Sequence, residues 1–174
     1  MTEAEWEHQK KLLQKVCFAV HESGHICAAC SRDLPVSAEI GIDVVTSIGR
    51  VGGMTWHFGG TSDDDLLILY AGIETSRRFG LSELGLLKDL ADIEEIAATL
   101  SDTESAKERA QREAEILIGK NEAVLLKMGY ALFQNGALDE AMTQKIYQGA
   151  IVTVAQEFLD TLDQISTFVW RLVA

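Results

Sequence analysis

Two histidines and a glutamate lie close together in the stretch His21-Glu22-Ser23-Gly24-His25, which has the pattern HExxH. On a helix, residues four apart share one face, so His21 and His25 would present their imidazoles to a single metal ion, most commonly zinc. Glu22 would lie beside that ion without binding it and could take a proton from a water molecule. Zinc lowers the pKa of a bound water to about 7, so these residues predict hydrolysis at neutral pH. The alternative is a chance pattern on a buried helix whose histidines are hydrogen-bonded in the core.

A catalytic zinc site needs three protein ligands and one open position. The remaining histidines are His8 and His57, and position 31, where an extended motif would carry its third histidine, is Ser31. The third ligand is therefore expected to be a carboxylate. Asp89 and Asp92 both lie at the predicted start of a helix. Because Asp89 could equally be the N-cap of that helix, spacing alone does not choose between the two roles.

Residues outside the motif offer weaker signals. Cys27 and Cys30 form a single CxxC within an apolar run, which indicates buried core thiols rather than a metal or redox site. His57 could face a cleft and steady a developing negative charge, although an exposed strand histidine is the favoured interpretation. The strand that contains it could offer an edge to an extended peptide. The candidate substrate strand comprises Gly53, Met54, Thr55, Trp56 and His57.

The composition predicts one globular domain spanning residues 1–174. Apolar residues make up 47% of the 174 residues and proline occurs once, which is typical of a chain with a real core. A net charge of −12 argues against nucleic-acid or anionic-membrane partners. Three cysteines do not suggest a disulfide framework, the first 15 residues are too charged for a secretory signal, and no stretch of eighteen apolar residues occurs. These features together predict a soluble, cytoplasmic protein.

The hydrophobic periodicity predicts a mainly α-helical domain with a small β-hairpin close to the metal-binding helix. A turn is expected at Gly49-Arg50, a loop over 81–88 and another turn at Asn135-Gly136. Strands are expected over residues 36–48 and 51–58. One helix is expected to begin at Thr61 or Ser62 and to end at Phe79, and further helices are expected over residues 3–31, 89–100, 104–128 and 138–174.

The motif resembles the HEAGH sequence of FtsH-type zinc metallopeptidases, the protease half of membrane-anchored ATP-dependent proteases. Other segments are similar to that family in the same order, over roughly residues 12–148. Gly52-Gly53-Met54-Thr55 resembles the family's glycine-containing strand, and residues 69–80 resemble its AGRAAEE…FG helix. Residues 85–90 resemble its G-x-x-N-D-[LI] segment, and Ile96-Ala97 resemble the apolar-Ala pair that follows this segment. Residues 121–147 resemble its closing helices. The resemblance implies a helical metallopeptidase domain in which Asp89 is the third zinc ligand, with Asp92 as the fallback.

The chain also departs from the family pattern. Lys88 stands where the family usually has Asn, and the helix around Gly72 is about one residue shorter, so its acidic residues cannot be transferred. No G-x-x-x-x-G-K-[ST] loop occurs. We therefore expect a stand-alone relative of the protease half, without ATPase or membrane anchor. The ring-forming family suggests a homo-oligomer or a separate unfoldase as possible partners.

These observations predict a zinc-dependent endopeptidase that cleaves peptides or unfolded proteins without ATP. Zinc would be held by His21, His25 and Asp89, with Glu22 as the general base. The alternative from another class is a catalytically idle binding or scaffolding domain that keeps the fold, with or without zinc. The intact Glu22 argues against this alternative, because a lapsed site has no chemical reason to keep it.

Overall fold

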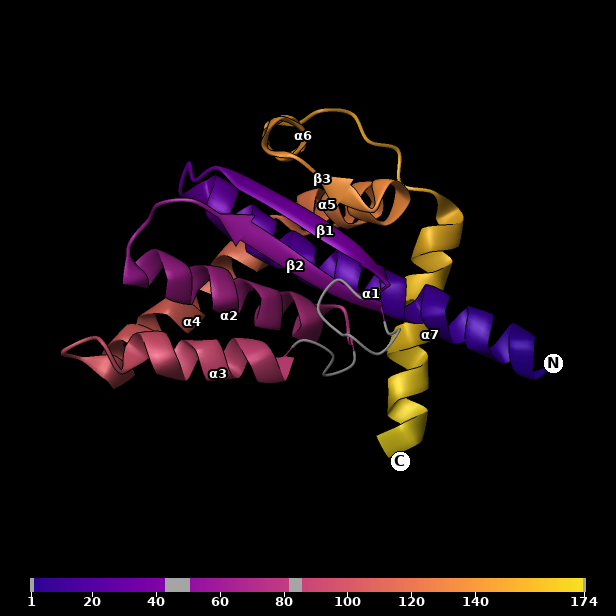
Figure 1. The fold of residues 1–174 in the computed structure, drawn as a ribbon, viewed down its shortest axis with the longest axis horizontal. Coiled ribbons are helices and arrows are strands. Elements are labelled where there is room, and N and C mark those ends of the chain that lie inside the picture. Colours follow the sequence, from indigo (N-terminus) through magenta and orange to yellow (C-terminus); the bar gives the residue numbers. More distant parts are fainter. Residues whose placement is uncertain (1, 43–50, 82–85, 174) are drawn as a thin grey trace.

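A 29-residue helix, α1 (Glu3–Ser31), is the axis of the fold. The computed structural model describes residues 2–42, 51–81 and 86–173, and the expected turn at Gly49-Arg50 and the loop around Gly85 lie outside these ranges. The other elements are β1 (Val36–Ile42), β2 (Val51–His57), α2 (Ser62–Arg78), α3 (Leu86–Ala97), α4 (Thr103–Lys120), α5 (Glu122–Asn135), β3 (Ala137–Leu138), α6 (Glu140–Tyr147) and α7 (Gln156–Val173). This is a mainly helical chain with a small sheet (Figure 1).

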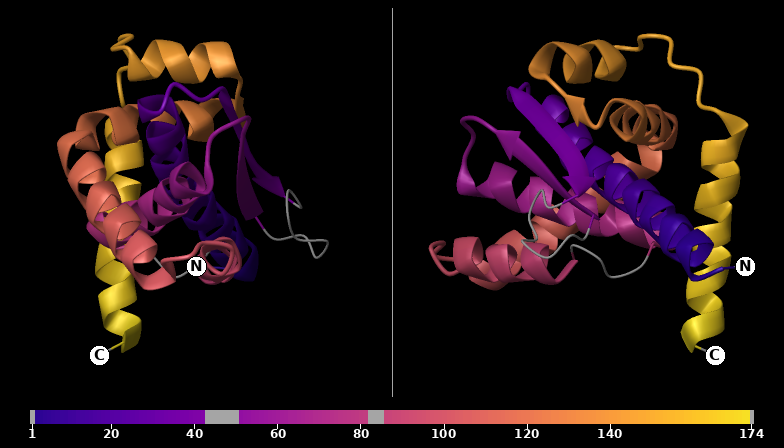
Figure 2. Two further views of the ribbon diagram at one scale, coloured as in Figure 1. Left: turned by 90° about the vertical axis from the view of Figure 1, so that its left-hand side faces the viewer. Right: turned by 45° about the vertical axis from the view of Figure 1, so that its right-hand side comes forward.

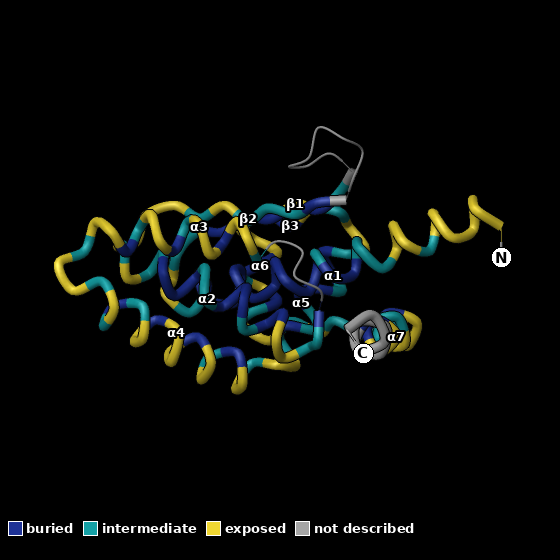
Figure 3. The backbone as a smooth tube through the Cα atoms, turned by 90° about the horizontal axis from the view of Figure 1, so that it is seen from below, coloured by how far each residue is buried: buried dark blue, intermediate teal, exposed yellow. Residues whose placement is uncertain are grey.

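The two halves of α1 have different surroundings. Its first turns are exposed and extend beyond the body of the molecule, whereas residues 16–30 are buried except for the half-buried Phe18 (Figure 3). A helix that is apolar on nearly every side must be enclosed by other elements. α2, α5 and the sheet pack around this buried half, so the HExxH segment lies at the centre of the fold.

The sheet has three antiparallel strands in the order β2-β1-β3. Along β1, Val36, Ala38 and Ile40 are buried, as expected for a strand that turns one face to the core. β1 pairs with β2 over its whole length and with β3 over two residues, Ala38 opposite Leu138 and Glu39 opposite Ala137. β2 is therefore an edge strand, and it lies over α1 on the side nearer α2 and α3 (Figure 1).

The remaining helices form two further layers of core. α2, α3 and α4 share a cluster that includes Leu66, Ile73 and Ile93. α7 crosses the N-terminal half of α1 and buries Phe158, Leu162 and other apolar residues against it (Figures 1 and 2). No helix in the described ranges combines the length and apolar character needed to cross a bilayer.

Several sequence predictions are confirmed by these elements. The mainly helical class with a β-hairpin, the long first helix, and the helix that follows Thr61 all occur. Thr61 caps α2 in a capping box with Asp64, and the acidic residues Asp63, Asp64 and Asp65 fill its first turn, which favours a helix N-terminus. The turn at Asn135-Gly136 separates α5 from β3.

Other predicted boundaries are wrong, and each has a local cause. The single helix expected over 104–128 is two helices, because the side-chain amide of Asn121 donates to the Leu117 carbonyl and ends α4. The C-terminal segment is a strand and two helices instead of one helix: Asp139 caps α6, and the β-branched run from Ile151 to Val154 leaves an extended connection before α7.

Two boundaries near the expected site also shift. β2 ends at His57, one residue before the expected end, whereas the expected continuation of the first strand over 43–48 lies outside the described residues. α3 starts at Leu86, earlier than expected, and ends at Ala97 instead of Leu100. Asp89 is consequently the fourth residue of α3 and not its N-cap.

Candidate metal centre and cleft

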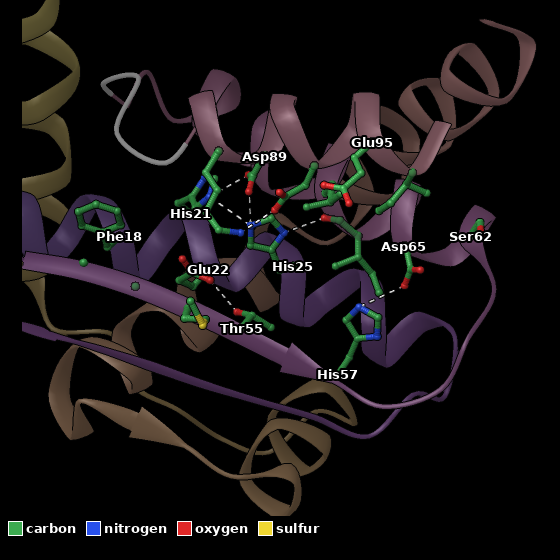
Figure 4. Close-up of a pocket in the computed structure, with 18 of the residues that line it drawn as sticks. Phe18, His21, Glu22, His25, Thr55, His57, Ser62, Asp65, Asp89 and Glu95 are labelled. Carbon is green, nitrogen blue, oxygen red and sulfur yellow. Dashed lines mark hydrogen bonds and ion pairs between the residues drawn. The ribbon is translucent and has the colours of Figure 1, made fainter. Parts of the chain in front are cut away.

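The HExxH residues lie on the wall of an open cleft between α1, β2 and α3 (Figure 4). The cleft encloses about 720 Å³. His21, Glu22 and His25 are each at most 5% exposed, and all three line the cleft. The prediction that the motif lies on one helix, with both imidazoles on the same face, is confirmed.

Three potential ligand atoms converge at the base of this cleft. The two histidine Nε2 atoms are 3.1 Å apart, and the Oδ2 atom of Asp89 lies 3.2 Å from that of His21 and 3.4 Å from that of His25. Zinc bonds of about 2.0–2.1 Å in a tetrahedral site require ligand atoms about 3.3–3.4 Å apart. The spacing of these three atoms therefore fits one zinc ion with a fourth position open.

Asp89 is buried, and the Nε2 atoms of both histidines lie within ion-pair distance of its Oδ2. Burial by itself would raise the pKa of Asp89, but the charge of His25 and the hydrogen bonds of both histidines hold it well below its usual value. Burial likewise opposes the charge on His25, yet Asp89, Glu22 and the Ile68 carbonyl raise its pKa to about 9. Asp89 and His25 therefore each favour the charged form of the other.

The α2 helix holds both imidazoles from behind. The Nδ1 of His25 donates to the Ile68 carbonyl at 2.8 Å, which leaves its Nε2 available to the cleft when the ring is neutral. The Nδ1 of His21 lies 2.9 Å from the hydroxyl of Ser76. Between them is Gly72, where an added Cβ would lie 2.5 Å from His25 Nε2, so only glycine leaves room for that ring.

Glu22 is held by β2 instead. The Thr55 hydroxyl donates to its Oε2 at 2.7 Å, and an added Cβ at Gly53 would lie 2.8 Å from its Cγ and Oε1. Ligand-type atoms of His21, Glu22 and His25 lie within 4.8 Å of one another, so this group alone could hold a metal ion. Asp89 also brings a carboxylate oxygen to within 3.4 Å of both imidazole Nε2 atoms, whereas one oxygen of Glu22 accepts the hydrogen bond from Thr55.

Asp92, the alternative carboxylate, lies elsewhere in the cleft. Its Oδ2 is 2.6 Å from the ammonium group of Lys88, one turn earlier on α3. The positive charge of Lys88 and the negative charge of Asp92 therefore compensate each other. Lys88 also lines the cleft, and its pKa is raised, chiefly by its hydrogen bond to Asp92.

The candidate substrate strand lies along the cleft, with Gly53, Met54, Thr55 and His57 among its lining residues. Trp56 does not line it. His57 is a strand residue, as expected, but it is half-buried and not exposed: its side chain is 22% exposed and its Nε2 lies 3.4 Å from Asp65 Oδ1. Figure 4 shows His57 and Asp65 facing each other at the end of the cleft away from Phe18.

Hydrogen bonding fixes which β2 groups face outward. The Phe58 N–H donates to the Pro35 carbonyl, so the Val36–His57 pair is a non-hydrogen-bonded pair in the antiparallel register. The same alternation directs the backbone groups of Gly53, Thr55 and His57 away from β1. Among the described residues no strand pairs with this edge of β2, and these three residues line the cleft.

The two cysteines of the CxxC are core residues, as predicted. Cys27 and Cys30 are almost completely buried in the main cluster, and burial is the leading cause that raises the pKa of each thiol to about 12. Neither has the thiolate character that metal binding or redox chemistry needs at neutral pH.

Sequence reasoning missed the supporting residues Ile68, Gly72 and Ser76. A usable signal exists, because they recur every fourth position and so form one face of α2. Small residues at that spacing on an apolar helix indicate close approach of another element. A comparison with protein-family models and one with the sequences of curated proteins found no match to this chain.

Proposed function

We propose that this protein is a zinc-dependent peptidase that hydrolyses peptide bonds in peptides or unfolded chains. His21, His25 and Asp89 would hold the zinc ion, and Glu22 would be the general base. The proposal is carried by one observation, the convergence of two imidazole nitrogens and a buried carboxylate oxygen at 3.1–3.4 Å in an open cleft.

A bound zinc ion would supply Lewis acidity, polarising the substrate carbonyl and lowering the pKa of a water molecule. The residues of the chain would handle the proton. Glu22, oriented by the Thr55 hydroxyl, would accept the proton of the attacking water as the new C–O bond forms. It would then donate that proton to the amide nitrogen as the C–N bond breaks, so the products are a carboxylic acid and an amine.

The free edge of β2 supports an extended peptide as the substrate. The outward backbone groups of Gly53, Thr55 and His57 can pair with a peptide main chain, which gives affinity without demanding one sequence. Glu22 contacts the same strand, so a peptide on this edge would bring its carbonyl groups past the general base. The preference for unfolded chains follows from this mode, because a folded substrate would first have to expose an extended segment.

The resemblance to the protease half of FtsH-type enzymes fits this proposal, as does a cytoplasmic location. The proposed activity needs no nucleotide, because metal and base supply the chemistry of a reaction that is thermodynamically downhill. A homo-oligomer or a separate unfoldase could deliver folded substrates, but neither is required for cleavage of an unstructured chain.

The decisive experiment combines metal analysis of the purified protein with cleavage of an unfolded casein-type substrate. We expect about one zinc per chain and cleavage that a chelator stops and added zinc restores. Glu22→Gln keeps the side-chain shape but removes the base, so activity should fall by about two to four orders of magnitude while zinc stays bound. Full activity of this variant would refute the role of Glu22. Retained zinc without any hydrolysis by the unmodified protein would instead indicate the idle scaffolding domain.

A further inference from the structure

The cleft has two walls that face each other across the metal centre. One is the free edge of β2, and the other is the face of α3 that carries Lys88, Asp92 and Glu95, continued by Thr99 in the turn after the helix. These residues follow one another at helical spacing, so they form a row along the cleft. A peptide paired with β2 would lie between the strand and this row.

The charges along the row are uneven. Lys88 and Asp92 compensate each other through their 2.6 Å contact. Glu95 is exposed and has neither an ion-pair nor a hydrogen-bond partner among the residues that the structure describes. Asp65, from α2, is the next carboxylate at this end, and its one described ion-pair partner is His57. Glu95 and Asp65 therefore place two carboxylates at this end of the cleft, of which Glu95 has no described partner.

The opposite end of the cleft has a different chemistry. Phe18 and Gln14, on the turns of α1 before the motif, line it and carry no charge. Figure 4 shows Phe18 on one side of His21 and His25, with Glu95, Asp65 and His57 on the other. The cleft is therefore polarised along its length, from a neutral end to an acidic end, with the metal centre between them.

The direction of a bound peptide follows from β2. Antiparallel pairing is slightly more stable than parallel pairing, so the peptide is expected to run against the strand, with its N-terminal side at the His57 end. Glu95 is six residues beyond Asp89 on α3, which places it about 9 Å further along the helix axis. An extended peptide covers that length with about three residues.

We propose that Glu95, assisted by Asp65, selects peptides with a lysine or arginine about three residues N-terminal to the cleaved bond. This inference rests on the proposed peptidase function and adds the substrate class. Because the position is partly solvated, the ion pair is expected to favour a basic residue over a neutral one by about two- to fivefold. The preference should shrink as ionic strength rises.

The test uses fluorogenic peptides of about ten residues that differ at one position, with Lys, Gln or Glu two, three or four residues before the cleaved bond. The cleavage point is mapped by mass spectrometry, and kcat/KM is measured with the zinc-loaded protein. Binding of the same peptides is measured separately by fluorescence anisotropy with zinc-loaded Glu22→Gln. We expect the Lys peptide to be preferred in both measurements.

Two variants assign the preference to the proposed residue. Glu95→Gln should remove most of it, and Glu95→Lys should favour the Glu peptide instead. Glu94→Gln is the matched control, because the neighbouring Glu94 contacts Lys107 and does not line the cleft. It should keep the preference for Lys.

The outcomes separate this inference from the proposed function. Cleavage with no basic preference, with a preference that survives in Glu95→Gln, or with a preference on the C-terminal side of the cleaved bond would overturn the inference and leave the peptidase function standing. Selective binding of the Lys peptide without any cleavage by the unmodified protein would support the inference and overturn the peptidase function. Neither binding nor cleavage would overturn both.

Discussion

Replacing Gly72 by alanine should uncouple metal binding from folding. Gly72 lies in the middle of α2, directly behind the ring of His25. An added Cβ would lie 2.5 Å from the Nε2 atom, the atom proposed to bind zinc, so the ring must move. The ring cannot move freely, because its Nδ1 is bonded to the Ile68 carbonyl at 2.8 Å. The methyl group therefore displaces a ligand atom while leaving every ligand residue in the sequence.

Gly72→Ala should have a small effect on the unfolding free energy and a large effect on zinc affinity. Alanine in a helix interior is favoured over glycine by about 1 kcal/mol, and overpacking of a core site costs about 1–3 kcal/mol. The metal-free variant should thus lose only about 0–2 kcal/mol of unfolding free energy. Altered orientation of a metal-binding histidine typically lowers metal affinity 10–100-fold, and direct overlap with the ligand atom should reach the upper end of that range.

The assay is a competitive zinc titration against a chromophoric chelator, with thermal unfolding of the metal-free protein followed by circular dichroism. Gly119→Ala is the matched control, since Gly119 lies in α4 and the nearest atom to its added Cβ is Arg78 Nη1 at 4.0 Å. The control should bind zinc normally and unfold at the same or a slightly higher temperature. Zinc affinity of Gly72→Ala within about threefold of the unmodified protein would refute the proposed contact between α2 and the ligand.

Further predictions concern the third ligand, the general base and the energy source. Asp89→Ala should abolish or greatly weaken zinc binding, whereas Asp92→Ala should only remove the exposed contact with Lys88; metal analysis of the two variants would reveal an exchange of roles. Thr55→Val removes the hydroxyl that orients Glu22, so kcat should fall about 10-fold or more with zinc content unchanged, and an unaltered kcat would count against that orientation. ATP should not stimulate cleavage by this chain, and a tightly folded protein should be cut far more slowly than its denatured form; stimulation or equal cutting would contradict the proposed mode.

Sequence patterns predicted the fold best where one helix carries its own signals. The buried half of α1 is apolar on nearly every side, and α2 has both a capping residue and an acidic first turn. The boundary between α4 and α5 was not predicted from the sequence, because no proline marks it. α4 ends where the Asn121 side chain donates a hydrogen bond to the Leu117 carbonyl. β3 is too short to form a pattern at all, and it exists because β1 offers a second edge: the Ile40 N–H donates to the Gly136 carbonyl.

The residues of the candidate site also differ in how well the sequence predicted their positions. His21, Glu22 and His25 are brought together by one helix, so their spacing alone predicted their juxtaposition. The position of Asp89 depends on how α3 packs, and spacing from the motif across more than sixty residues carries no such information.

A signal for Asp89 was nevertheless present within α3 itself. Asp89, Ile93 and Ala97 recur every fourth residue, and they are the three buried residues of this helix. Burying a carboxylate is costly unless a cation or hydrogen-bond donors compensate its charge. A carboxylate in phase with the buried stripe therefore predicts a positive partner in the interior, whereas Asp92 is out of phase and pairs with Lys88 at the surface. The periodicity of α3 by itself thus favours Asp89 over Asp92 as the proposed third ligand, independently of any resemblance to a known family.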